Sequence, residues 1–271
     1  MIASPVAAMG RLPRRSPWQV QRDVLFALVQ REMKARVGGQ WVGAVWTLFE
    51  PLAHVALMVA ILGSLRGALM PGIEYPVFLA VGLVPFFLFQ NLAFRLMDGI
   101  DANKGLFAYR QVKPLDTLLS RSVVEALMNL VVYALTLGVM GWIGFHVLPH
   151  QPLEMMGINL LIILFGMAFG IFAAVLTHDR PRGRSLLRML MFPMYLASGV
   201  IFPVDLLPRE YIEILLWNPM LHLVELSRAS FIAAYTPTRG IHALYPALVM
   251  LVFGALGMLL YRVRRQELIA S

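Results

Sequence analysis

The sequence contains no cysteine, which excludes a disulfide framework, a thiolate metal site and a cysteine nucleophile. It also lacks a GxxxxGK(S/T) segment, so the chain cannot hold nucleotide phosphates in a P-loop of its own. Neither HExxH nor GxSxG occurs. Charged residues make up only 14% of the chain, whereas a soluble domain has about 25%. These absences argue against a soluble enzyme, and we expect no catalytic residue, metal or cofactor in this chain.

Apolar residues are abundant: 59% of the 271 residues are hydrophobic, and the mean hydropathy is +0.72. A membrane-crossing helix needs about 20 mostly apolar residues. The sequence therefore predicts an all-α, polytopic membrane protein with six transmembrane helices in one domain, 40–262, between an N-terminal region, 1–39, and a tail, 263–271. The expected spans are 40–64, 76–97, 122–145, 157–177, 186–204 and 242–262.

Lysine and arginine are concentrated in alternate connections between the predicted spans. They gather before the first span, between the second and third, between the fourth and fifth, and after the sixth. The opposite loops hold only Arg66, Arg209, Arg228 and Arg239. Because cytoplasmic loops carry the excess of positive charge, we expect both termini in the cytoplasm. The net charge of +8 then reflects topology and headgroup attraction, which disfavours a nucleic-acid partner.

Two segments do not fit a simple count of spans. Residues 18–38 place apolar side chains on one side and several cations elsewhere, which favours a helix along the cytoplasmic interface over a flank that only sets topology. Residues 205–235 hold two helical stretches, separated at Asn218–Pro219, that are too short and too polar to span. We interpret them as a re-entrant pair entering from the outer face, with an amphipathic surface loop as the alternative.

Three predicted spans carry polar residues at helical spacing: Trp46, Glu50 and His54; Phe87, Asn91, Arg95 and Asp98; and Glu125, Asn129, Tyr133 and Thr136. Ionisable groups in a membrane nearly always face a bundle interior or a wet cavity. One interpretation is that the groups join helices, with Glu50 or Glu125 paired to Arg95. The other, favoured for the first span, is a path for a sugar, since sugars offer C–H faces to aromatic rings and hydroxyls to carboxylates. The candidate path residues are Trp41, Trp46, Glu50, His54, Phe86, Phe87 and Tyr195.

The expected cytoplasmic loop 98–121 contains an apolar cluster among charges. Leu106, Phe107 and Tyr109 stand between Lys104 and Arg110. An aromatic knob with a charged rim is typical of a surface that docks on a soluble partner. A solvated loop leading to a helix start at Pro114 explains the charges but not this cluster.

Several stretches resemble the membrane subunits of type-2 ABC exporters of polysaccharides. They are REMKARVGG (31–39), WTLFEPL (46–52), KGLFAYRQVKPLD (104–116) and SGVIFPVDLLPREYIEILLWNPMLHLVELSRASF (198–231). The compact length is most similar to that of capsular-polysaccharide permeases, and O-antigen and teichoic-acid permeases share much of the pattern. The resemblance covers nearly the whole chain.

This resemblance implies a homodimer that works with two copies of a separate ATPase subunit, which binds ATP and magnesium. It also implies a lipid-linked polysaccharide as substrate, and a periplasmic co-polymerase and an outer-membrane exporter as partners. The implied ATPase-coupling residues are Leu106, Phe107, Tyr109, Arg110 and Lys113, with His178 and Arg180 as a second contact. The implied outer-gate residues are Trp217, Asn218, His222, Glu225 and Arg228.

Two rival functions come from other classes. A proton-coupled transporter would use Glu50 and His54 as a relay and would need no ATPase. A membrane glycosyl or lipid transferase would need clustered acidic residues near the cytoplasmic interface. Asp98, Asp101 and Asp116 are the available candidates, in a context without a recognised donor-binding pattern.

Overall fold

A computed structural model describes residues 16–37, 45, 49, 52–61, 72–109 and 111–270 of the chain. Within these ranges, four helices are long and apolar enough to cross a membrane. They are α3 (Tyr75–Met97), α4 (Pro114–Ile143), α5 (Pro152–Leu176) and α9 (Leu244–Ala270). The prediction of an all-helical, multi-pass membrane protein is confirmed at this level, while the count of six spans stays a prediction.

The other two expected spans coincide with shorter helical segments. Residues Leu52–Ile61 are helical and apolar within the expected span 40–64, most of which lies outside the described residues. Helix α6 (Pro181–Ala197) overlaps the expected span 186–204 but begins and ends earlier. The expected re-entrant segment forms a short 3-10 turn, η2 (Val204–Leu206), followed by α7 (Arg209–Leu215) and α8 (Pro219–Phe231). Its position relative to a membrane stays a prediction.

Helix α3 forms the centre of the bundle because it is mostly apolar and largely buried. It packs most extensively on α5, which also packs on α9. Gly166 and Gly170 of α5 make this close approach possible. A Cβ atom at either glycine would lie 3.0 Å from a side-chain atom of Leu92 or Leu96. Small residues four apart commonly let membrane helices approach closely, and here they join two helices of one chain.

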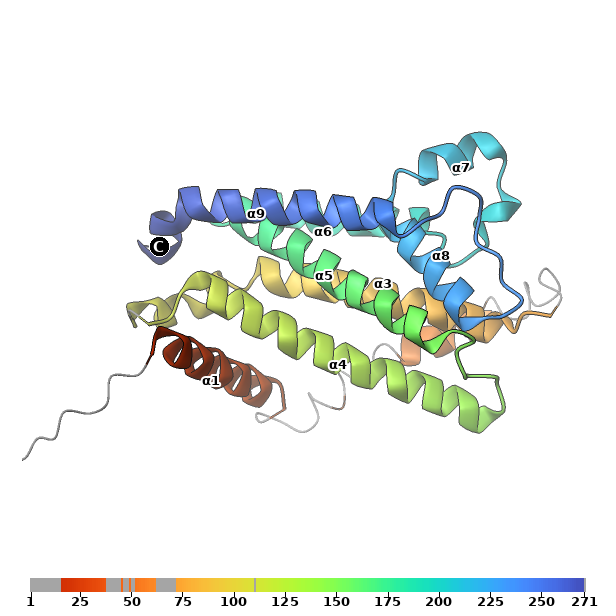
Figure 1. Cartoon of the computed structure of the whole chain (residues 1–271), viewed down its shortest axis with the longest axis horizontal. Coiled ribbons are helices and arrows are strands. Elements are labelled where there is room, and N and C mark those ends of the chain that lie inside the picture. Colours follow the sequence, from red (N-terminus) through yellow and green to blue (C-terminus); the bar gives the residue numbers. More distant parts are fainter. Residues whose placement is uncertain are drawn as a thin grey trace, which may run out of the picture.

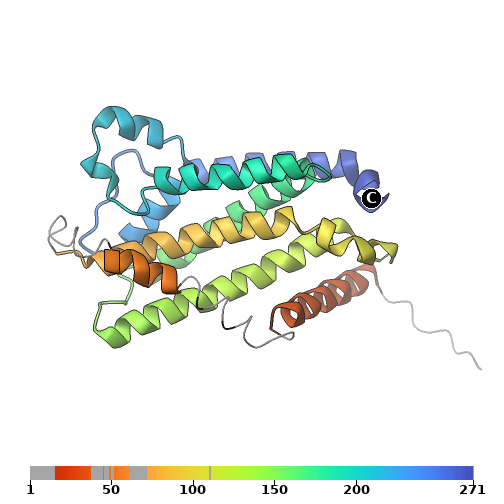
Figure 2. The ribbon, with the colours of Figure 1, turned by 180° about the vertical axis from the view of Figure 1, so that it is seen from behind.

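Different segments of the chain lie at the two ends of the bundle. Figure 1 shows the loop before α4, the C-terminal end of α9 and the start of α1 (Pro17–Val37) at one end, with α7 at the other, and Figure 2 shows the same from behind. The loop contains a 3-10 helix, η1 (Asp101–Ala108). We call these the η1 end and the α7 end. If the predicted orientation holds, the η1 end faces the cytoplasm.

Helix α1 is the helix predicted over 18–38, and it lies against the first half of α4. Its contacts with the bundle are largely polar. Gln21 donates a 2.6 Å hydrogen bond to Asp116, and Glu32 lies 3.4 Å from Arg121. Arg36 pairs with Glu125, and both side chains are buried. Helix α1 is therefore fastened to α4 by directed charges as well as by apolar contact.

Candidate functional site

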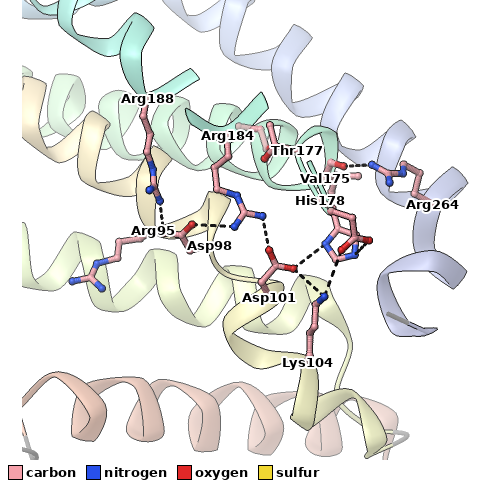
Figure 3. A network of polar contacts seen from close by, with 12 residues as sticks. Arg95, Asp98, Asp101, Lys104, Val175, Thr177, His178, Arg184, Arg188 and Arg264 are labelled. Atoms are coloured by element: carbon pink, nitrogen blue, oxygen red, sulfur yellow. Dashed lines mark hydrogen bonds and ion pairs between the residues drawn. The ribbon is translucent and has the colours of Figure 1, made fainter. Parts of the chain in front are cut away.

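A charge cluster joins three parts of the chain at the η1 end (Figure 3). Asp98 is the residue that ends α3, and Asp101 and Lys104 belong to η1. His178 and Asp179 form the turn between α5 and α6, and Arg184 and Arg188 lie in the first turns of α6. The backbone of Asp179 is left-handed, with φ at 56°, a conformation that aspartate tolerates better than most residues. The turn can therefore bring α6 back toward the end of α3.

The arginines of α6 bind the carboxylates that follow α3. Arg184 donates to Asp101 at 2.5 Å and to Asp98 at 3.4 Å. Arg188 donates to the second oxygen of Asp98 at 2.5 Å. Two arginines thus share two carboxylates, and the start of α6 is fixed against the end of α3 and the start of η1 by charge-assisted hydrogen bonds.

His178 occupies the inner side of the cluster, where its ring is only 1% exposed. Its Nδ1 lies 3.3 Å from Asp101 and its Nε2 lies 3.0 Å from Asp179. Burial lowers the pKa of His178 below its ordinary value of 6.5, although Asp179 and Asp101 act in the opposite direction. Burial raises the pKa of Asp101, but the hydrogen bond and charge of Arg184 outweigh it and hold this pKa below its usual value.

Asp101, His178 and Asp179 present ligand atoms within 4.8 Å of one another, which is compatible with a metal ion. The surrounding charges argue against one. Lys104 lies 3.4 Å from Asp101 and 3.5 Å from Asp179, and Arg184 already binds Asp101. Because these cations neutralise the carboxylates, the cluster is better described as an ion-pair network than as a cation site.

The predicted ATPase-coupling residues divide by exposure. Tyr109 is 65% exposed, and Lys113 and Arg180 are also exposed. Phe107 is buried in the hydrophobic core and Leu106 is half-buried. Arg110 lies outside the described residues. Only Tyr109 of the aromatic pair is free to touch a partner directly, and Phe107 instead anchors η1 to the bundle.

The predicted outer-gate residues form a second polar cluster, which we call the α8 cluster. Arg228 is fully buried and stacks over the ring of Phe78, 3.6 Å from its centroid. Its guanidinium donates to the carbonyl oxygens of Phe78, Gly199 and Val200, at 3.3, 2.9 and 2.6 Å. Arg228 therefore ties α8 both to α3 and to the residues that follow α6.

Glu225, one turn before Arg228, is fully buried and has several donors. It accepts hydrogen bonds from the hydroxyl of Tyr235 at 2.6 Å and from the hydroxyl and backbone N–H of Thr238 at 3.1 and 3.2 Å. Nη1 of Arg228 lies 3.4 Å away. A buried carboxylate is tolerated only when it is paired and hydrogen-bonded in this way, so Glu225 fixes the loop after α8.

The first half of α8 is held by Asn218 and His222. Asn218 accepts from the backbone N–H of Met220 and donates to Ser198. Nδ1 of His222 accepts from the backbone N–H of His242, so Nε2 carries the proton and donates to the carbonyl of Leu216 at 2.9 Å. Trp217 differs from these residues, because it is 80% exposed.

The described part of the predicted substrate path brings three segments together. The ring of His54 meets Phe87 edge-on at 5.1 Å, and Phe87 stacks on Tyr195 of α6 at 6.5 Å. Phe86 is buried and contacts Tyr195 at 5.2 Å. Trp41, Trp46 and Glu50 lie outside the described residues, so their place in this path stays a prediction.

Of the two partners expected for Arg95, Glu125 lies 3.6 Å from it, and Glu50 lies outside the described residues. Asn91 donates to Asn129 at 3.4 Å. The sequence did not reveal that Arg36 of α1 also pairs with Glu125. Nor did it reveal the pairs that Arg184 and Arg188 make with the carboxylates after α3. The sequence does place acidic residues at the end of one predicted span and basic residues at the start of another, but topology alone is a sufficient explanation for these cations.

Known proteins are similar to this chain over nearly its whole length. The model of the family described as ABC-2 type transporter matches residues 23–232. The polysialic acid transport protein KpsM of Escherichia coli is 35% identical over 257 residues, which are 95% of this chain and 99% of the relative. The capsule polysaccharide export inner-membrane protein CtrC of Neisseria meningitidis is 28% identical over 91% of this chain and 95% of its own length. The O-antigen export system permease protein RfbA of Myxococcus xanthus is 26% identical over 92% of this chain and 95% of its own length.

Proposed function

Because the chain belongs to the family of ABC-2 type transporters, we propose that it is the permease subunit of an ATP-driven exporter of capsular polysaccharide in the bacterial inner membrane. The observation that carries this function is the 35% identity to a polysialic acid transport protein, which extends over 99% of that relative. The O-antigen permease is less similar, at 26% identity, so capsule export is favoured over O-antigen export.

The finer features of this function are also proposals. Two copies of the chain form a path for a lipid-linked polymer, and two separate ATPase subunits bind and hydrolyse ATP with magnesium. A periplasmic co-polymerase and an outer-membrane exporter receive the polymer. The η1 end faces the cytoplasm and the α7 end faces outward, which agrees with the excess of lysine and arginine in the loops at the η1 end.

The ATPase docks on η1 in this proposal, with Tyr109 as its direct contact. This side chain is 65% exposed directly after a short helix whose own aromatic residue, Phe107, is held in the core. An exposed tyrosine beside cations is a frequent anchor in protein interfaces. Motion of the ATPase would reach the bundle through η1 because Phe107 and the charge cluster connect η1 to it.

Co-purification tests the proposal. The chain is expressed with the ATPase encoded beside its gene, and ATP hydrolysis is measured with and without the chain. Tyr109→Ala should weaken the complex or the stimulation of hydrolysis, whereas Gln111→Ala, at a neighbouring exposed position, should not. A chain that binds no ATPase would contradict the exporter and would direct attention to Glu50 and His54 as a proton relay.

Trp46 and Glu50 contact sugar during passage in this proposal, because an aromatic face and a carboxylate suit carbohydrate. The test is polymer export by Trp46→Ala and Glu50→Gln variants that still insert and bind the ATPase. Reduced export supports a place in the path. Normal export by both variants would show that Trp46 and Glu50 are not needed in the substrate path.

A further inference from the structure

Helix α6 is only weakly embedded in the bundle. Met191 is its single buried residue in the part of the chain that the structure describes. Phe192 and Met189 are exposed, at 66% and 75%, and α6 contacts α3 only sparsely. A helix with few packed side chains is free to shift relative to its neighbours at low cost, unless its ends are fixed.

Polar contacts fix both ends of α6. At the η1 end, Arg184 and Arg188 bind Asp98 and Asp101, as described above. At the other end, Arg228 donates to the carbonyls of Gly199 and Val200, just beyond α6. Ser198 also accepts from Asn218.

The two fastenings differ in burial. Arg228 is fully buried, so breaking its hydrogen bonds would leave a buried charge without partners, which is costly. Arg188 and Asp98 are each 43% exposed, and Arg184 is 17% exposed. Ion pairs open to solvent cost little to break because water and counterions replace them. The fastening at the η1 end is therefore the releasable one.

We infer that Arg184 and Arg188 are positioning residues of transport, which hold the start of α6 on Asp98 and Asp101 and let go of them when η1 moves. This inference rests on the proposed function, because it takes motion of η1 by the ATPase as its cause. The same carboxylates belong to the end of α3 and to η1, so a movement of η1 changes their distance from α6 directly. Release frees the start of α6, while Arg228 keeps its far end in place.

Reversible cross-linking tests whether this contact must open. The natural chain has no cysteine, so Asp101→Cys with Arg184→Cys introduces the only two thiols. A short bifunctional methanethiosulfonate reagent joins them, and a reductant separates them. In a complex with the ATPase, transport of the host polysaccharide into vesicles should fall at least about tenfold on cross-linking and should recover on reduction. The two single-cysteine variants, treated alike, are the controls.

Each result has a distinct meaning. Lost transport with continued ATP hydrolysis, or reversible loss of both, supports the inference because either shows that the contact must open. Undiminished transport by the cross-linked protein would overturn it. If the untreated natural chain neither binds an ATPase nor transports polymer, the proposed function fails, and that failure is visible before any cross-link is made.

A charge exchange separates positioning from a merely structural role. Arg184→Asp should lower the polymer transported per ATP hydrolysed, and adding Asp101→Arg should restore part of it. Arg182→Asp, an exposed arginine two residues away, should leave this ratio unchanged. A double variant no better than the single one, with thermal stability equal to that of the natural chain, would argue against the pairing.

Discussion

Arg228 shows how a single glycine can decide whether a charge fits inside the bundle. The guanidinium lies against α3 at Gly82, where a Cβ atom would stand 2.4 Å from Nη2. Nearby, Pro85 cannot donate a hydrogen bond to the carbonyl of Val81, and Ser227 of α8 approaches that carbonyl at 3.4 Å instead. Gly82 therefore leaves room for the guanidinium of Arg228, and Pro85 leaves the carbonyl of Val81 available to Ser227.

We predict that Gly82→Ala destabilises the protein by about 1–3 kcal/mol, because the added methyl overpacks a site whose neighbour is held by three carbonyls. Gly138→Ala in α4 is the matched control, since a Cβ there meets no atom within 4 Å. That change should be neutral or stabilising by up to about 1 kcal/mol. Unfolding of the two purified variants in detergent measures the difference, and equal effects would contradict the close contact.

His178 should make stability depend on pH. Its pKa in the folded protein is below 6.5, so the unfolded chain binds more protons once the pH falls below that value. Stability is then complete above pH 6.5 and declines as the pH falls below it. The depressed pKa of Asp101 adds stability that persists until the pH falls below its ordinary value of 3.8. The two effects therefore occupy separate pH ranges.

The melting temperature of the natural chain should thus decrease as the pH is lowered from neutral to below 6.5. His178→Asn should remove part of that decline because asparagine does not titrate, while His222, whose pKa burial also lowers, still contributes. His150→Asn, at an exposed position, should retain it. An unchanged decline in the His178 variant would show that another group is responsible.

Among the elements, α1 shares a buried charge with two of the membrane helices, in addition to its other polar contacts with α4. Glu125 of α4 is paired with Arg36 of α1 and with Arg95 of α3. The amide of Asn129 also donates to Glu125 at 3.0 Å. Three helices therefore meet at a single carboxylate, and the position of α1 depends on it.

Arg36→Ala should cost roughly 3 kcal/mol, the lower end of what breaking a buried pair costs, because Arg95 still faces Glu125. Arg22→Ala removes a cation of α1 whose side chain is 73% exposed, and it should cost less than about 1 kcal/mol. Unfolding in detergent and the rate of proteolysis of α1 report both effects. A cost for Arg36→Ala no larger than that for Arg22→Ala would mean that α1 is not locked to α4 through Glu125.

The sequence predicted elements better than it predicted contacts. The length of the apolar segments identified α3, α4, α5 and α9, because a run of about 20 mostly apolar residues is typical of a membrane-spanning helix. Helical spacing correctly suggested that Glu125 meets Arg95, since both lie on polar stripes. Arg36 was missed because a cation before a predicted span has a sufficient explanation in topology. Phe107 was expected as a surface knob, and its burial could not be read from a helix of only 8 residues.

In the whole molecule, the two polar clusters suit different roles. His222, Glu225 and Arg228 of the α8 cluster are buried and have hydrogen-bond partners, so they suit a fixed support. The charge cluster is partly open to water and links η1 to α6, so it suits a contact that changes during transport. The permease proposed here is thus rigid at the α7 end and adjustable at the η1 end.

Deleting the gene in the source bacterium separates a role in export from a role in synthesis. Polysaccharide is then measured separately at the cell surface and inside the cell. We expect surface polymer to be lost while polymer of normal composition accumulates in the cytoplasm, and we expect the natural gene to restore export. Surface polymer that is unchanged, or polymer that is absent from both places, would contradict an export permease, and the second result would indicate a role in synthesis.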